Sequence, residues 1–116
     1  MPVFTLNTNV AQAKISTDFV NTLSAAVAKA LGKPESYVVV HVVGGQTLSF
    51  GGSTAPAASA VLKSIGGLGT SKQNNAIAAI LYPIVEQAIG VPADRMYIEF
   101  VNLAASAVAF EGQTFG

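Results

Sequence analysis

A proline directly after the first methionine is the feature of this sequence with the clearest chemical potential. Methionine is usually removed when the next residue is small, and removal of Met1 would leave Pro2 with a free secondary amine. An α-amino group titrates near ~8, against ~10.4 for a lysine side chain, and burial or a nearby cation lowers its pKa further. Such an amine can act as a general base near neutral pH. The alternative is that Pro2 serves only in processing or stability.

A base that removes a proton from the carbon beside a carbonyl needs a neighbouring group that stabilises the negative charge of the substrate. Lys33 supplies a cation that would bind a carboxylate and keep the Pro2 amine nearer neutrality. Because Lys33 follows an expected helix end, the alternative is that it only offsets the negative end of the helix dipole. His41 is the single histidine and lies in an apolar run, so we interpret it as a core or interface side chain rather than a catalytic one.

Composition excludes several other kinds of site. The 116 residues include no cysteine, which excludes disulfides, zinc-thiolate centres and thiol nucleophiles. No His, Asp or Glu cluster has the spacing of a metal site, and we expect neither a metal nor a cofactor. Six basic residues balance six acidic ones, so no nucleic-acid partner or anionic membrane is expected. Without a visible signal peptide or membrane span, we expect a cytoplasmic protein, with secretion by a route that needs no signal peptide as the alternative.

Two similar halves are expected to position the candidate residues. The sequence at 30–34 (A-L-G-K-P) recurs at 88–92 (A-I-G-V-P). In both places an apolar helical pattern ends at glycine, and a proline, a turn and a strand follow. We therefore expect a single domain over 1–116, built from pseudo-repeats of about 1–57 and 58–116.

Hydrophobic periodicity predicts two helices and five strands. One helix follows a cap at Ser16, Thr17 or Asp18 and ends near Leu31, and the other spans about 71–89 with a kink or register break at Pro83. Strands are predicted at 3–7, 37–43, 57–65 and 96–102, with a small one near 108–110. The β-branched run 37–43 is typical of a strand buried on both faces.

These elements predict an α/β fold of two βαβ units. Side by side, the units form a four-stranded mixed sheet with two helices on one face. The other face would be apolar and uncovered. Three such sheets closing on one another would cover it, so the architecture indicates a trimeric assembly.

Short segments along the whole chain resemble the macrophage migration inhibitory factor family of the tautomerase superfamily. In chain order they are Met1–Phe4, Asn7–Val10, Leu31–Pro34, His41–Val43, Phe50–Ser53, Ser64–Gly66, Asp94–Ile98 and Thr114–Phe115. Each segment is short, but their order and spacing together are specific. The resemblance implies a homotrimer with an active site at each subunit interface.

The resemblance also assigns roles to individual residues. In that family the processed N-terminal proline is the base in keto–enol tautomerisation of phenylpyruvate-like or dopachrome-type substrates, and this role falls on Pro2. Lys33 matches the lysine that holds the substrate carboxylate. Ile65 matches the residue whose backbone amide bonds the substrate, and Ser64 beside it is expected to belong to the substrate-binding residues as well.

The remaining matched positions form the rim of the implied site. Tyr97 matches a tyrosine contributed by the neighbouring subunit, and Tyr37, Val108 and Phe110 match the apolar rim. Glu99 stands where many members have asparagine. A carboxylate there would oppose an acidic substrate and favour the protonated form of Pro2, unless Glu99 pairs with Lys33 or Arg95 or turns to solvent.

Two functions remain open on this resemblance. The first is a keto–enol tautomerase acting on a small keto or enol substrate. The second is a secreted, cytokine-like ligand of an invariant-chain type of cell-surface receptor, with a vestigial pocket. The intact Pro2, Lys33 and Tyr97 favour the enzyme. The family's Cys-x-x-Cys pair is replaced by Ala57 and Ala60, which excludes a thiol oxidoreductase.

Overall fold

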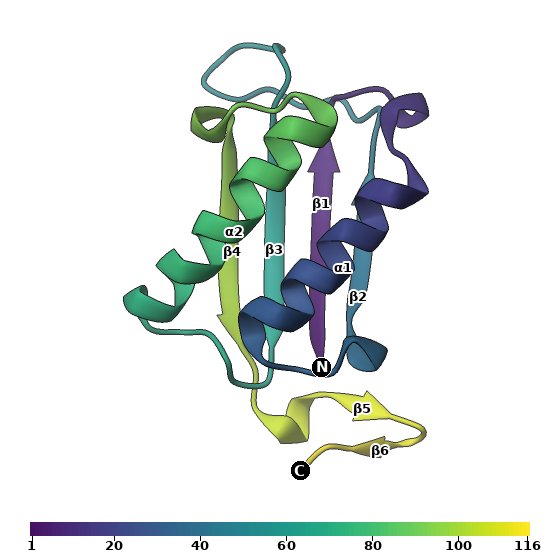
Figure 1. Ribbon diagram of the computed structural model, residues 1–116, viewed down its shortest axis with the longest axis vertical. Coiled ribbons are helices and arrows are strands. Elements are labelled where there is room, and N and C mark those ends of the chain that lie inside the picture. The colour runs from purple at the N-terminus through teal and green to yellow at the C-terminus, as the bar shows by residue number, and fades with distance from the viewer.

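The computed structural model describes all of residues 1–116 and shows a four-stranded sheet with both helices on one face (Figure 1). The strands are β1 (Pro2–Thr8), β2 (Val39–Val43), β3 (Ala58–Ser64) and β4 (Met96–Asn102), and their order across the sheet is β2-β1-β3-β4. β1 runs parallel to β2, and β3 runs parallel to β4, whereas the central pair β1–β3 is antiparallel. The predicted mixed sheet of two βαβ units is confirmed.

The first helix, α1 (Thr17–Leu31), begins and ends at residues that satisfy its terminal backbone groups. The Ser16 hydroxyl accepts a hydrogen bond from the Phe19 backbone nitrogen at 3.1 Å, so Ser16 is the cap among the three candidates. Gly32 ends the helix in the left-handed conformation, with φ of 66°, which glycine adopts without steric cost. This sharp end sends the chain directly into Lys33.

The second helix, α2 (Ser71–Ile89), continues without a break through Pro83. Thr70 and Gln73 form a reciprocal capping box at its start. The predicted register break at Pro83 does not occur, because that ring lies on the exposed side while the opposite stripe packs on the sheet: Ile77, Leu81, Val85 and Ile89. Neither helix combines the length and the apolar character that a membrane crossing requires.

One hydrophobic core lies between the helices and the sheet. It contains 17 buried side chains drawn from both βαβ units, so the two units fold onto each other. Phe4 and Leu6 of β1 and Leu62 of β3 are its fully buried centre, with 0% exposure each. The opposite face of the sheet carries no covering element (Figure 1).

The strand expected at 37–43 is shorter and less buried than the sequence predicts. Residues Glu35–Tyr37 form a single 3-10 turn, and β2 starts only at Val39. β2 is an edge strand, and only its helix-facing side, with Val40 and Val42, packs on the core. Val39 is 52% exposed, so the prediction of burial on both faces is wrong for the single chain.

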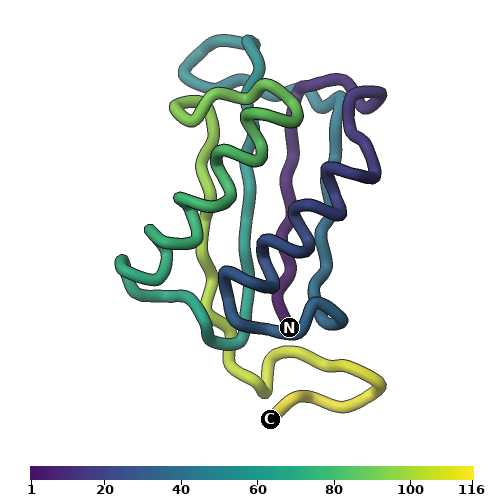
Figure 2. The backbone as a smooth tube through the Cα atoms, in the orientation of Figure 1, coloured from purple at the N-terminus to yellow at the C-terminus, as the bar shows by residue number.

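A small hairpin lies beyond the end of the sheet that holds the N terminus. Its strands are β5 (Ala109–Phe110) and β6 (Gln113–Thr114), and the sequence predicted only the first. The Phe115 nitrogen donates to the Val108 carbonyl at 3.0 Å, which fixes the chain end against the hairpin. Figure 2 shows the hairpin and the N terminus at one end of the molecule, and the long loop between β2 and β3 at the other.

Pro83→Ala should stabilise the protein. Alanine restores a backbone donor for the Ala79 carbonyl and removes the clash of the ring with the preceding turn, worth about 3 kcal/mol in helix interiors. Greater freedom of the unfolded chain offsets up to about 1 kcal/mol of this. Urea unfolding at fixed protein concentration should show a gain of about 1–2 kcal/mol. Gln87→Ala, an exposed change in the same helix, should be nearly neutral, and a less stable Pro83→Ala protein would contradict the argument.

Candidate functional site

Four of the predicted site residues meet at the end of the sheet where the chain begins. Pro2 starts β1 directly opposite Ser64, the last residue of β3, and both side chains are fully buried. Lys33 reaches this point from the end of α1, and its Nζ donates to the Ile65 carbonyl at 3.0 Å. The antiparallel β1–β3 pairing and the sharp end of α1 therefore bring a cation close to the start of the chain.

The terminal amine has an altered pKa in this environment. Partial burial, and secondly the positive charge of Lys33, lowers the pKa of the Met1 amine below its ordinary value. While Met1 is attached, the Pro2 nitrogen is an amide with no basic lone pair. Removal of Met1 would leave the free amine on Pro2, at the buried start of β1 and on the side of the sheet where Lys33 ends.

An apolar cavity of about 340 Å³ opens beside the chain terminus. Nine of its ten lining residues are hydrophobic, and they come from the N terminus, the turn before β2 and the C-terminal hairpin: Met1, Val3, Ser36, Tyr37, Val38, Val39, Val108, Ala109, Phe110 and Phe115. All three predicted rim residues are in this set. Its size and character suit an aromatic or aliphatic group of a small ligand.

Three aromatic rings form one wall of that cavity. The Tyr37 ring packs edge-on against Phe110 at 5.5 Å and against Phe115 at 6.2 Å, and the rings of Phe110 and Phe115 stack at 6.0 Å. Phe115 was not predicted as a site residue, although the Thr114–Phe115 segment carried part of the family resemblance. Its place in that segment, close in the sequence to the predicted rim residue Phe110, was the signal that could have identified it.

Tyr97 and Glu99 lie away from this cavity in the same chain. Tyr97 pairs with Ser59, and Ser59 pairs with Asn7, which is five residues along β1 from Pro2. At about 3.3 Å per residue, that register places Tyr97 about 16 Å along the sheet from Pro2. The structure therefore divides the predicted residues into two groups, and one chain cannot join them in a single site.

Tyr97 is an exposed aromatic ring supported by its neighbours. It is 73% exposed, and its ring lies 5.0 Å from the Phe50 ring, with the Arg95 guanidinium 5.5 Å from the centre of Phe50. Arg95 donates its hydrogen bonds to the backbone carbonyls of Ser53, Ala55 and Pro56, which ties the β2–β3 loop to this ring. Phe50 was missed as a candidate, although it belongs to a segment that carried the resemblance.

Glu99 shares the open face of the sheet with Tyr97. Both side chains are exposed, as the alternation of β4 predicts. The two cations proposed as partners make other bonds: Lys33 bonds the Ile65 carbonyl, and Arg95 bonds the loop carbonyls. His41 is exposed on the same face, so within one chain it is not a core residue.

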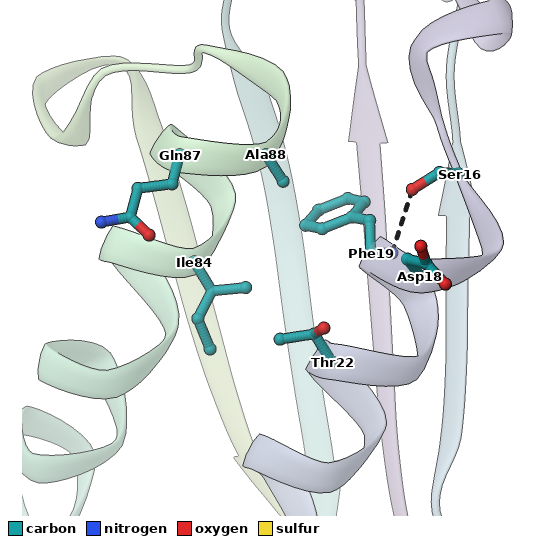
Figure 3. Close-up of a pocket in the computed structure, with 7 residues that line it drawn as sticks. All are labelled: Ser16, Asp18, Phe19, Thr22, Ile84, Gln87 and Ala88. Carbon is teal, nitrogen blue, oxygen red and sulfur yellow. Dashed lines mark hydrogen bonds between the residues drawn. The ribbon is translucent and has the colours of Figure 1, made fainter.

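A groove between the two helices holds none of the predicted residues. It has a volume of about 320 Å³ and is lined by Ser16, Asp18, Phe19, Thr22, Ile84, Gln87 and Ala88 (Figure 3). Its one hydroxyl at the helix start, that of Ser16, is already used as the cap of α1. No cluster of metal-ligating side chains occurs in the structure.

The fold and the site together define a small α/β protein of two βαβ units with a lysine and an apolar cavity at its amino terminus. The family model for macrophage migration inhibitory factor (MIF) matches residues 1–116. The MIF homolog of Brugia malayi is 53% identical over 116 residues, 100% of each chain, and Xenopus laevis MIF is 40% identical over 115 residues, 99% of each. The MIF structure from Trichinella spiralis has a TM-score of 0.93 and 46% identity, covering 97% of this chain and 99% of that one.

The chain therefore belongs to the macrophage migration inhibitory factor family. The resemblance seen in the sequence is confirmed over the full length of the protein. Membership supports an isomerase-type activity in general terms.

Lys33→Met should raise the pKa of the terminal amine. Removing the cation removes a repulsion that disfavours the protonated amine, so the pKa moves upward, but it stays below the ordinary value because burial is the larger cause. An NMR titration of the terminal residue measures the shift. Lys29→Met, an exposed change earlier in α1, is the control and should leave the pKa unchanged. A lower pKa in Lys33→Met would contradict this account of the site.

Proposed function

We propose that the protein is a keto–enol tautomerase for phenylpyruvate-like or dopachrome-type substrates, and that Pro2, freed of Met1, is its base. The observation that carries this proposal is the position of Pro2 at the buried start of β1, close to Lys33 and to the apolar cavity. The same surroundings lower the pKa of the Met1 amine. A neutral amine at physiological pH is what proton abstraction beside a carbonyl requires. Family membership supports the same reaction class.

The proposed reaction moves one proton and needs no cofactor. The neutral Pro2 nitrogen removes a proton from the carbon beside the substrate carbonyl, and the electron pair of that C–H bond becomes the C=C bond of an enolate. The protonated amine then returns its proton to the enolate oxygen. In the reverse direction the same nitrogen takes the hydroxyl proton and delivers it to carbon.

Substrate binding follows from the surroundings of Pro2. Lys33 holds the substrate carboxylate, and the Ile65 backbone amide bonds the substrate at the neighbouring position. The substrate ring enters the cavity beside Tyr37, Val108 and Phe110. A carboxylate and an aromatic ring on one small molecule match a cation next to an apolar cavity.

The complete site also requires a second copy of the chain. We propose a homotrimer in which Tyr97 of one subunit reaches the Pro2 site of the next, because the register keeps the two apart within a chain. The exposed edge residue Val39 and the uncovered sheet face would be buried in this assembly. Glu99 would accompany Tyr97 and place a negative charge near the substrate carboxylate, so it would weaken binding of acidic substrates.

A cytokine-like role is the second proposal, and it rests on the names of full-length relatives. The Brugia malayi protein, 53% identical, is named a macrophage migration inhibitory factor homolog. A ligand of an invariant-chain type of cell-surface receptor would present the outer surface of the same trimer. It would be a cytoplasmic protein that leaves the cell without a signal peptide.

Pro2→Gly should remove most of the tautomerase activity and leave the thermal stability nearly unchanged. Glycine keeps an amine but changes its basicity and freedom, and general acid–base catalysis typically contributes ~10²–10⁴-fold. Phenylpyruvate turnover should fall within that range, while the thermal unfolding curve stays close to that of wild type. Protein that retains Met1, checked by intact mass, should also be inactive, because its Pro2 nitrogen is an amide. Full activity in either protein would contradict the assignment of the base.

Mixed trimers should show that Tyr97 acts across a subunit boundary. Pro2→Gly and Tyr97→Ala subunits each lack one part of every site, so both homotrimers should be impaired. Refolded together in equal amounts, they should regain about a quarter of wild-type activity. The reason is that each trimer containing both variant subunits has one intact site among its three. Pro2→Gly mixed with Lys33→Met is the matched control and should regain no activity. Pro2 and Lys33 of each site come from the same subunit, so no mixed trimer of these variants has an intact site. Equal recovery in both mixtures would contradict the shared site.

A further inference from the structure

Ser64 carries a buried hydroxyl that has no hydrogen-bond partner. Only two polar residues of the chain are buried, Thr8 and Ser64, and both are 0% exposed. The Thr8 hydroxyl donates to the Ala57 carbonyl at 2.7 Å and accepts from the Val10 nitrogen at 3.1 Å. The Ser64 oxygen Oγ bonds no other group of the protein. Because buried polar groups are nearly always paired, this exception requires an explanation.

The position of Ser64 in the sheet offers that explanation. Ser64 lies directly opposite Pro2 in the β1–β3 ladder, and both side chains face the helices. Side chains opposite each other in an antiparallel pair have Cβ atoms about 4.5–5.5 Å apart, so the hydroxyl lies next to the Pro2 ring. While Met1 is attached, the Pro2 nitrogen carries no hydrogen and cannot donate to Ser64. Removal of Met1 creates a donor at this nitrogen.

Full burial also changes the role expected for the Ser64 side chain. A hydroxyl with no exposed surface is enclosed by the chain itself, and a substrate in the adjoining cavity does not reach it. The Ser64 carbonyl is occupied as well, since it accepts from the Leu103 nitrogen at 2.8 Å. The side chain therefore acts on the protein rather than on the substrate.

We propose that Ser64 Oγ accepts a hydrogen bond from the free Pro2 amine and thereby directs the nitrogen lone pair into the cavity. A neutral secondary amine has one N–H and one lone pair, and catalysis requires the lone pair to face the substrate. The N–H then points elsewhere, and Lys33, a cation, cannot accept it. Ser64 is a positioning residue in this scheme, and its effect on catalysis rests on the proposed function.

The hydrogen bond has a predictable effect on the Pro2 amine. An accepting hydroxyl favours the protonated form, so it opposes the lowering of the pKa by burial and by Lys33. In Ser64→Ala the acid limb of the pH–rate profile should move to lower pH. The kcat should fall about tenfold, because orientation of the lone pair is lost. The KM should stay unchanged, because the hydroxyl does not touch the substrate.

A thermal unfolding cycle over Met1 and Ser64 tests the contact without using activity. Wild type and Ser64→Ala are each prepared with Met1 retained and with Met1 removed, and all four are melted at one protein concentration. With Met1 retained, Ser64→Ala should leave the Tm unchanged or raise it, because an unpaired hydroxyl disappears. With Met1 removed, it should lower the Tm by about 3 °C or more, because a hydrogen bond is lost. Thr8→Val, which removes the paired buried hydroxyl, should lower the Tm equally in both forms.

The cycle and the kinetics separate two kinds of failure. Equal effects of Ser64→Ala with and without Met1 would overturn the contact. An unshifted pH–rate profile, or a raised KM with unchanged kcat, would overturn the positioning role. If the Tm effects differ as expected but the processed protein does not tautomerise phenylpyruvate, the contact stands and the proposed function fails.

Discussion

The antiparallel pairing of β1 with β3 is the interaction on which the rest of the structure depends. It joins two parallel βαβ units into one sheet, and it places the side chains of both units on a single core. Its register also sets Pro2 opposite Ser64. A shift of one residue would turn the buried side chains of β1 to the open face and separate the chain terminus from the end of β3. The stability of the core and the geometry of the proposed base therefore share one cause.

The electrostatics of the site follow from where α1 ends. Gly32 in the left-handed conformation stops the helix, and the next residue, Lys33, reaches across to the Ile65 carbonyl. This fixes a cation beside a partly buried amine, in a chain whose charges are few and balanced. The base proposed for this protein, the free Pro2 amine, would lie in these surroundings.

The open face of the sheet leaves large apolar side chains exposed on the single chain. Val39 and Tyr97 are large, exposed and apolar at its two edges, and Tyr97 is supported by Phe50 and Arg95. An aromatic ring that is 73% exposed yet held by neighbours is expected where another protein surface covers it. The proposed trimer would bury this face, and it would also bring together the two groups of site residues that the register separates.

The sequence alone determined the two helices, the four strands of the main sheet, the order of these elements and the family. Periodic apolar stripes ending at Gly32 and Gly90 marked the helices, and β4 was predicted with its observed bounds. The sequence could also name Pro2, Lys33 and the rim residues, because their types carry the chemistry. The sequence did not show that β2 is an edge strand, because a run of β-branched residues is compatible with both a central strand and an edge strand.

Only the tertiary structure decided which candidates lie together. The pairing of strands that are distant in the sequence brought Pro2, Lys33, Ser64 and Ile65 to one end and left Tyr97 at the other. Packing of the C-terminal hairpin added Phe115, and packing of the β2–β3 loop added Phe50. That the Ser64 hydroxyl has no partner depends on the positions of all the surrounding donors and acceptors, which only the tertiary structure gives. Local sequence fixes residue type and secondary structure, whereas contacts between distant segments depend on the whole packed chain.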